Sequence, residues 1–253
     1  IIVDAERMHT AAQNHFLKTL EEPRGNSLFL LLTEHPGLLL PTIRSRCQRL
    51  HFGALKPATV AELLLRDRDL PGDLAHSIAA LSQGQMSRAI DLVESERRDI
   101  VLDIVKELAN GGDPLEQAES FSGHLDTRRR QIESALKAEL NADEQAATTK
   151  ENLEEAKQEM AAAAEAIVRK EIMEYLYLFE TWYRDAMVIQ ATGSDKALLN
   201  RDQTAELAAY VAARGDRLDI PPKLDAVEKC RVRLERNISQ ERVLRDLFFV
   251  LAG

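Results

Sequence analysis

Two short apolar runs stand near the start of the chain, and an amphipathic segment lies between them. The runs occupy residues 1–3 and 28–32, and each is bounded by polar residues without polar and apolar alternation. Such runs are typical of strands buried on both faces of a parallel sheet. Residues 8–20 carry apolar side chains at spacings of three and four, which predicts a helix with one apolar face. Pro23 stops that helix, so the pattern predicts a strand–helix–strand unit.

The remainder of the chain has a helical pattern. Residues 48–52 predict one last short strand, after which apolar residues recur at helical spacing. Pro71-Gly72 and Gly84 separate three predicted helices, and from about residue 96 onward the pattern is helical throughout. The predicted fold class is therefore mainly α with an N-terminal α/β part.

The segment 126–170 differs from its surroundings. It is rich in alanine, glutamate, lysine and arginine and contains neither glycine nor proline, and Leu153, Met160 and Ile167 lie seven residues apart. This spacing indicates two to three weak heptads, and a turn at residues 141–143 would fold the segment into an antiparallel helical hairpin. The hairpin could bind a partner, but the composition favours a solvated helix packed on one side.

Aromatic residues concentrate in one later stretch. Residues 175–190 contain Tyr175, Tyr177, Phe179, Trp182 and Tyr183. Aromatic side chains at this density on a helix favour a core position over a cofactor site, because each buries a large apolar area.

Composition limits the classes of function. The 253 residues are 45% hydrophobic and 30% charged, which is usual for a soluble, helix-rich protein, and 33 Lys and Arg against 42 Asp and Glu give a net charge of −9. An acidic chain is a poor stand-alone binder of nucleic acid, because neutralised phosphates supply most non-specific affinity. Cys47 and Cys230 are too far apart to suggest a metal site. Without an apolar run of roughly 20 residues or a signal peptide, we expect a cytoplasmic protein with no membrane partner.

Polar residues follow both N-terminal apolar runs. Asp4 comes after the first and Thr33 after the second. Ligands of open α/β sheets sit at the carboxyl ends of strands, so this pair could hold a metal-bound water and a phosphate. Both residue types also cap helices well, and on these two residues alone the capping interpretation is favoured.

Three short motifs follow one another in the first fifth of the chain. They are Leu-Lys-Thr-Leu-Glu-Glu-Pro at residues 17–23, which ends in Glu21, Glu22 and Pro23, then Leu-Thr-Glu at residues 32–34, and Ser45-Arg46-Cys47. In this order and spacing they closely resemble the clamp-loader branch of the AAA+ ATPases, and within it the delta-prime type of bacterial DNA polymerase III subunit. The resemblance covers the first fifth of the chain strongly and the rest more loosely.

The resemblance implies an architecture. It gives part of an AAA+ parallel sheet at residues 1–53, a three-helix lid at 54–97 and a helical collar domain at 98–253, with about 126–170 as an insertion. The phosphate loop and the four-cysteine zinc module of the family lie upstream of the segment that matches Ile1. We therefore expect a C-terminal fragment without a cofactor of its own, whose first domain is incomplete and either loosely held or propped by a neighbour.

Arg46 is the site residue that the resemblance favours most. In clamp loaders the arginine of the Ser-Arg-Cys triplet enters the ATP site of the adjacent subunit as an arginine finger in trans. A guanidinium suits this role because it is always charged and binds phosphate oxygens in a bidentate manner. The alternative is a solvated basic edge formed with Arg44 and Arg49, and the flanking Ser45 and Cys47 favour the finger.

The same resemblance makes Asp4, Thr33 and Arg88 remnants of a nucleotide site. For Arg88 an ordinary exposed position on the first turn of a helix is equally compatible with the sequence. Ala5 stands where the family has a second carboxylate, and we expect Glu6 to point the other way, since a one-residue slip along a strand reverses the side chain. We therefore expect even the intact protein to hydrolyse ATP slowly or not at all.

The resemblance also implies partners. These are the gamma/tau-type and delta-type clamp-loader subunits, with ATP and Mg²⁺ at the neighbouring subunit, and the sliding clamp and primed DNA reached through the complex. The fragment alone is not expected to be catalytic, although the family is part of the DNA polymerase III holoenzyme. Two alternatives remain: an ATP-hydrolysing gamma/tau-type subunit, and a helical scaffold protein with vestigial AAA+ elements.

Overall fold

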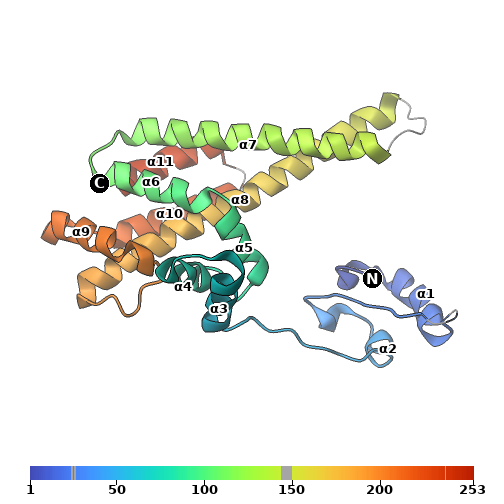
Figure 1. Ribbon diagram of the computed structural model, residues 1–253. Helices are drawn as coiled ribbons and strands as arrows, with labels where there is room; N and C mark the ends of the chain where they lie inside the picture. Colours follow the sequence, from blue (N-terminus) through green and yellow to red (C-terminus); the bar gives the residue numbers. More distant parts are fainter. Residues whose placement is uncertain (24, 26, 144–149, 237) are drawn as a thin grey trace. The chain divides into compact units, whose positions relative to one another are not determined.

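The computed structural model describes residues 1–23, 25, 27–143, 150–236 and 238–253. The chain forms two compact units, Ile1–Gly53 and Ala54–Gly253, and both are drawn in Figure 1. Helices make up nearly all of the regular structure described in either unit. The first boundary of the predicted architecture, after residue 53, coincides with the boundary between the units.

The described residues of the first unit contain two α-helices and two short 3-10 helices. In chain order they are η1 (Ala5–Arg7), α1 (Thr10–Glu21), η2 (Pro36–Leu38) and α2 (Pro41–Arg44). The predicted helix at 8–20 is confirmed as α1, and His9 caps it by accepting a hydrogen bond from the Ala12 amide at Nδ1, 2.9 Å away. Pro41 begins α2, where its missing amide hydrogen carries no penalty.

The predicted sheet is reduced to one parallel β-bridge between Ile2 and Leu31. Ile2 donates to the Leu30 carbonyl and accepts from the Leu32 amide, each at 2.8 Å, so the two predicted strands do run side by side. The expectation of strands buried on both faces is wrong, and the segment 48–52 is not a strand. Among the described residues of the unit no third strand joins the bridge, and apolar side chains stay open to solvent: Leu28 is 81% exposed and Phe52 is 87% exposed.

The core of the first unit is small. Its buried hydrophobic side chains are Ala5, Leu39 and Ile43. Gln13 is also buried, and it ties α1 to the segment before α2: its Nε2 donates to the Met8 carbonyl and its Oε1 accepts from the Leu40 amide, both at 2.8 Å. A buried amide with both ends bonded fixes the register of the elements it joins.

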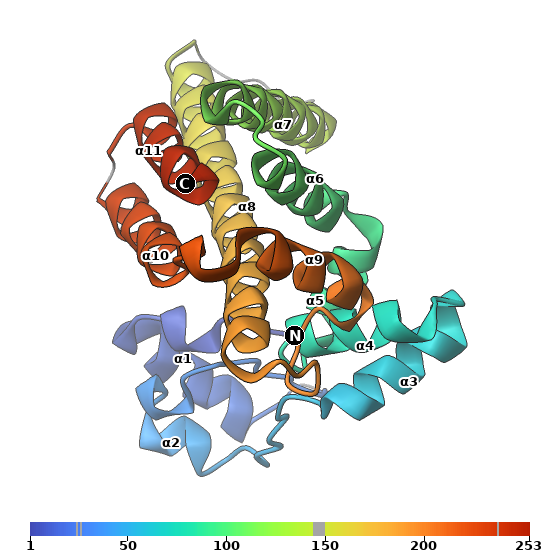
Figure 2. The same cartoon turned by 90° about the vertical axis from the view of Figure 1, so that its left-hand side faces the viewer.

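The second unit is a helical assembly around one long helix. Its elements in chain order are α3 (Pro57–Arg68), α4 (Gly72–Leu81), α5 (Met86–Glu94), α6 (Arg97–Ala109), α7 (Pro114–Asp143), α8 (Lys150–Thr192), η3 (Arg201–Gln203), α9 (Thr204–Arg214), η4 (Gly215–Arg217), α10 (Pro221–Glu235) and α11 (Gln240–Ala252). Figures 1 and 2 show α8 running through the unit with α6, α7, α10 and α11 around it. One continuous hydrophobic core extends from Val60 in α3 to Leu251 in α11, so the helices α3–α5 share it with those that follow.

The predicted breaks between α3, α4 and α5 are confirmed. Gly84 has φ +77°, and its carbonyl accepts a hydrogen bond from the Leu55 amide at 2.9 Å. A Cβ at this position would lie 2.3 Å from the Leu55 carbonyl oxygen. Both the backbone conformation and the close approach therefore require glycine here.

Helices α7 and α8 form the predicted long hairpin, which extends beyond the other helices of the unit (Figure 1). The turn is not at residues 141–143, because α7 continues to Asp143, and residues 144–149 lie outside the described part. The heptad register is wrong where the structure describes it: Ile167 is 39% exposed, whereas Ala164 and Val168 are fully buried. A spacing of four suits packing on one side of a globular core better than a seven-residue seam. Leu153 lies among the residues whose side chains are not described.

The predicted aromatic core of α8 is confirmed. Tyr175, Phe179, Trp182 and Tyr183 are each at most 4% exposed. Phe121 of α7 packs edge-on against Tyr175 with ring centroids 5.0 Å apart, which brings the two long helices together.

A buried lysine caps the last helix. Lys223 of α10 is 2% exposed, and its Nζ donates to the carbonyls of Val250 and Leu251, at 3.1 and 2.8 Å, at the C-terminal end of α11. The pKa of Lys223 is lowered to about 8. Burial is the largest cause, and the positive charge of Arg214 lowers the pKa by more than the negative charge of Asp219 raises it. None of the helices described here is both long enough and apolar enough to cross a membrane.

Candidate functional site

Arg46 lies two residues after the end of α2, and short local bonds set its direction. Its amide donates to the Ile43 carbonyl at 3.0 Å, which continues the helical turn, and the Ile43 side chain is buried. Ser45 Oγ donates to the Thr42 carbonyl at 3.0 Å, and Arg46 Nη1 donates to the same oxygen at 3.1 Å. The arginine is thus carried on a turn that a buried isoleucine anchors, while its side chain stays 40% exposed.

An ion pair joins two of the sequence motifs. Arg46 Nη2 lies 2.6 Å from Oε1 of Glu21, the last residue of α1, and the Glu21 side chain is 49% exposed. Glu22 and Pro23 complete the same motif, and the Glu22 amide donates to the Lys18 carbonyl at 3.0 Å as the helix ends. The structure therefore brings Glu21 and Arg46 together, a pairing that the sequence interpretation did not predict.

Cys47 completes the Ser-Arg-Cys triplet. It is a free, partly buried cysteine, and Cys230 in the second unit is free and buried. Burial raises the pKa of the Cys230 thiol to about 12, so this thiol is neutral and unreactive at neutral pH.

Asp4 and Thr33 follow the two bridged segments, but each has its own partner. Asp4 Oδ2 lies 3.6 Å from Arg7 Nε, while Thr33 Oγ1 accepts from the His35 amide at 3.1 Å. Both contacts are local, as in ordinary turn and capping structures. Their assignment to a nucleotide site remains a prediction.

The backbone that leads to Glu6 differs from the expectation. The Thr33 side chain is the largest cause of a lowered pKa of Glu6, followed by a backbone hydrogen bond. The expected reversal of direction presupposes an extended strand through Asp4, but Asp4 has φ 51° and ψ 47°, which is left-handed backbone. The strand alternation therefore ends before Glu6, so the premise of that expectation does not hold, and the direction of the Glu6 side chain stays a prediction.

Arg88 is held by its own unit. In the first turn of α5, its Nη1 donates to Gln83 Oε1 at 3.0 Å and its Nη2 to Glu174 Oε2 of α8 at 2.7 Å. The guanidinium carbon also lies 4.3 Å from the ring centroid of Tyr177, and the side chain is only 15% exposed. Burial raises the pKa of Tyr177, so the phenol stays neutral beside the cation. Arg88 thus links α5 to α8, and a role toward nucleotide stays a prediction.

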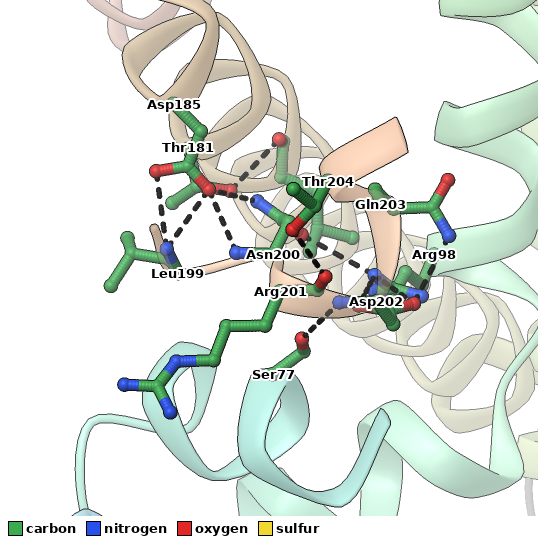
Figure 3. Close-up of polar contacts among 11 residues, drawn as sticks. Ser77, Arg98, Thr181, Asp185, Leu199, Asn200, Arg201, Asp202, Gln203 and Thr204 are labelled. Atoms are coloured by element: carbon green, nitrogen blue, oxygen red, sulfur yellow. Dashed lines mark hydrogen bonds and ion pairs between the residues drawn. The ribbon is translucent and has the colours of Figure 1, made fainter. Parts of the chain in front are cut away.

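A buried polar network, which the sequence interpretation missed, connects four parts of the second unit (Figure 3). Asp185 of α8 is fully buried and accepts from the Leu199 amide at 3.0 Å, the Asn200 amide at 2.7 Å and Asn200 Nδ2 at 3.0 Å. Arg184 Nη1 adds an ion pair at 2.6 Å. The carboxylate therefore fixes the turn that leads into η3.

The network continues to α6 and α4. Arg98 is 6% exposed, and its Nη2 donates to both carboxylate oxygens of Asp202 at 2.8 and 2.9 Å. The Asp202 amide in turn donates to Ser77 Oγ of α4 at 3.3 Å. Because the carboxylates of Asp185 and Asp202 are bonded to protein donors, the network holds the surrounding helices together. Its sequence signal was an aspartate three residues after Trp182, on the apolar face of α8.

The part of the chain that the structure describes holds no group of three or more His, Cys, Asp or Glu side chains that could bind a metal ion. The site residue that the first unit presents at its surface is Arg46, whose guanidinium is about half exposed. Such a group binds carboxylates and phosphates.

The chain shares sequence with known proteins over part of its length. Residues 1–56 match the model of the family described as "DNA polymerase III, delta subunit". The DNA polymerase III subunit delta′ of Bacillus subtilis is 37% identical over 99 residues, which are 39% of this chain and 29% of the relative. That of Haemophilus influenzae is 59% identical over 44 residues, 17% of this chain and 14% of the relative.

A different subunit is also similar. DNA polymerase III subunit tau of Bacillus subtilis is 29% identical over 130 residues, which are 49% of this chain and 19% of the relative. The chain thus spans less than a third of the length of these relatives. Taken together, the family match at residues 1–56 and the delta′ relatives, which match up to 39% of the chain, show that this chain is delta-prime-like in sequence over part of its length.

Proposed function

We propose that this chain is part of a bacterial replicative clamp loader, as a delta-prime-like subunit of DNA polymerase III. In this role it assembles with gamma/tau-type and delta-type subunits and helps to load the sliding clamp onto primed DNA during DNA replication. The similarity of residues 1–56 to the DNA polymerase III delta family supports the proposal, together with the delta′ relatives. The net charge of −9 fits a subunit whose contact with DNA depends on others.

Within the complex, Arg46 donates an arginine finger to the ATP and Mg²⁺ site of a neighbouring subunit. The observation that carries this step is the half-exposed Arg46 side chain at the end of α2, on a backbone turn anchored by Ile43. Arginine fingers are worth about 10³–10⁵ in rate in well-studied phosphoryl-transfer systems. The chain's own contribution to hydrolysis is small, since Ala5 provides no carboxylate after Asp4.

The alternative within the same complex is an ATP-hydrolysing gamma/tau-type subunit. The similarity to subunit tau over 130 residues favours it. The third candidate, a helical scaffold protein with vestigial AAA+ elements, rests on the large helical second unit.

Assembly and turnover test these candidates. The full-length protein is produced with gamma/tau-type and delta-type subunits, and the ATPase rate of the purified complex is compared for wild type, Arg46→Ala and the exposed control Arg49→Ala. We expect co-purification, a rate reduced by at least about 100-fold at the affected site in Arg46→Ala, and an unchanged rate in the control. A chain that fails to assemble would favour the scaffold. Vigorous turnover by the full-length chain alone would favour the gamma/tau-type assignment.

A further inference from the structure

We propose that Glu21 is a positioning residue for Arg46: its carboxylate holds the guanidinium in the orientation in which it meets a phosphate of the neighbouring subunit. The inference rests on the proposed function of Arg46 and adds a second residue to it. It starts from the 2.6 Å ion pair between Glu21 Oε1 and Arg46 Nη2.

Two elements hold the guanidinium. Glu21 at the end of α1 forms an ion pair with Nη2, and the Thr42 carbonyl of α2 accepts a hydrogen bond from Nη1 at 3.1 Å. A guanidinium has five N–H donors, so these two contacts leave at least three of them for phosphate oxygens. The anchors therefore fix the plane of the fork and still leave it able to bind an anion.

The two anchors are themselves fixed relative to each other. Gln13 of α1 accepts a hydrogen bond from the Leu40 amide at 2.8 Å, immediately before α2 begins at Pro41. Gln13 is 4% exposed, so water competes little with this bond. The bond ties the first turn of α1 to the segment that leads into α2, so Glu21 and Thr42 hold the arginine from two helices that are connected within the first unit.

The exposure of the two side chains determines whether the ion pair contributes to folding stability or to the order of the arginine. At 40% and 49% side-chain exposure, the ion pair adds little to folding, as is usual for surface ion pairs. Its effect lies in the side chain that it orders, because a flexible arginine loses much of its rotamer freedom when it binds a phosphate. Because Glu21 already restricts the Arg46 side chain in the free subunit, less rotamer freedom is left to lose when the arginine binds the phosphate.

The test uses the full-length protein in the assembled complex with saturating and limiting ATP. Glu21→Gln keeps the shape of the side chain and removes its charge, and Glu22→Gln removes the same charge one residue along as the matched control. We expect Glu21→Gln to lower kcat by about three- to tenfold with KM for ATP within twofold, and Glu21→Asp to restore part of the rate. Glu22→Gln should behave as wild type.

A double variant separates positioning from a general structural role. In the Arg46→Ala background, Glu21→Gln should have no further effect on kcat, because nothing remains for it to position. An equal fall in both backgrounds, or a wild-type or raised kcat for Glu21→Gln alone, would overturn the inference while leaving the role of Arg46 intact. A wild-type rate for Arg46→Ala would instead refute the proposed function itself.

Discussion

The two units of this chain differ in how far they bury their apolar side chains. The first unit buries Ala5, Leu39 and Ile43 and leaves apolar side chains such as Leu28 and Phe52 largely exposed. The second unit encloses one continuous core from α3 to α11. Apolar runs that look like buried strands in the sequence thus remain open when the unit lacks a layer to cover them.

Charged groups show the same contrast. Arg98 and Asp202 of the second unit pair at 2.8 Å with side chains 7% and 14% exposed, whereas Arg46 and Glu21 of the first unit pair at 2.6 Å with both side chains far more exposed. In low-dielectric surroundings, breaking a pair leaves an uncompensated charge, but at the surface water replaces the lost partner. Burial, rather than distance, should therefore decide the energetic weight of polar contacts in each unit.

The largest effect is expected from Asp185→Ala in the second unit. The substitution leaves the Leu199 amide, the Asn200 amide and Arg184 without their shared acceptor. We expect a loss of about 3–5 kcal/mol in the free energy of unfolding. The single tryptophan of the chain, Trp182, lies in this core, so its fluorescence during urea unfolding follows this unit.

The control for Asp185 is Asp195→Ala, which removes an exposed carboxylate from the following loop. It should shift the free energy of unfolding by less than about 0.5 kcal/mol. Equal costs for the two alanine variants would mean that the buried network adds no more than a surface charge, and the contrast between the units would lose its main support.

Lys223 provides a pH-dependent test of the same core. Its pKa is lowered to about 8 in the folded chain from an ordinary value of 10.5, so between these pH values the unfolded state binds a proton that the folded state has released. The free energy of unfolding should therefore rise with pH across this window, by at most about 3 kcal/mol. Below pH 8 both states are protonated, and the contribution no longer changes with pH.

The difference between wild type and Lys223→Met isolates this contribution. Burial raises the pKa of Tyr175 and of the Cys230 thiol to about 12, so above their ordinary values these groups reduce stability as pH rises. Both variants share these groups, so their contributions cancel in the difference of urea-unfolding free energies. A difference that stays constant from pH 8 to 10.5 would contradict a shifted titration of Lys223.

The contrast also explains what the sequence could and could not predict. Helix α1, the breaks around α4 and the aromatic core of α8 follow from local periodicity and from glycine and proline, and the structure confirms them. The sheet could not be judged in this way, because a strand is stabilised by neighbours that local pattern does not specify. The buried register of α7 and α8 likewise depends on which neighbours they meet.

In the candidate site, too, some features could be predicted from the sequence and others could not. Motif spacing singled out Arg46, but not its partner Glu21, because α1 and α2 are brought together by the Gln13 bond rather than by sequence proximity. The end of the strand before Glu6 was missed, because an aspartate tolerates left-handed backbone but also adopts extended backbone, so Asp4 alone does not predict the turn. Asp185 was missed because a polar residue within an aromatic helix becomes significant only once its donors are known.

Gln13→Ala tests how firmly the first unit is held. The variant loses the bonds to the Met8 carbonyl and the Leu40 amide, at an expected cost of about 1–3 kcal/mol. Since the tryptophan lies outside this unit, the measurement is amide hydrogen exchange at Leu40, which should accelerate by about five- to 150-fold. Asn14→Ala, an exposed change on the same helix, should leave the exchange unchanged. Equal exchange in both variants would show that other contacts hold α2.

The smallest effect on folding is expected at the pair that carries the proposed function. Glu21→Gln in the chain by itself should change the free energy of opening of the first unit by less than about 0.5 kcal/mol, because both partners are well solvated. Amide exchange in α1 measures this, and raising the salt concentration should remove any small difference, since exposed pairs are screened. A cost comparable to that of Asp185→Ala would mean that Glu21 serves the fold itself. An effect on turnover without an effect on folding is what an ion pair kept at the surface for a ligand should show.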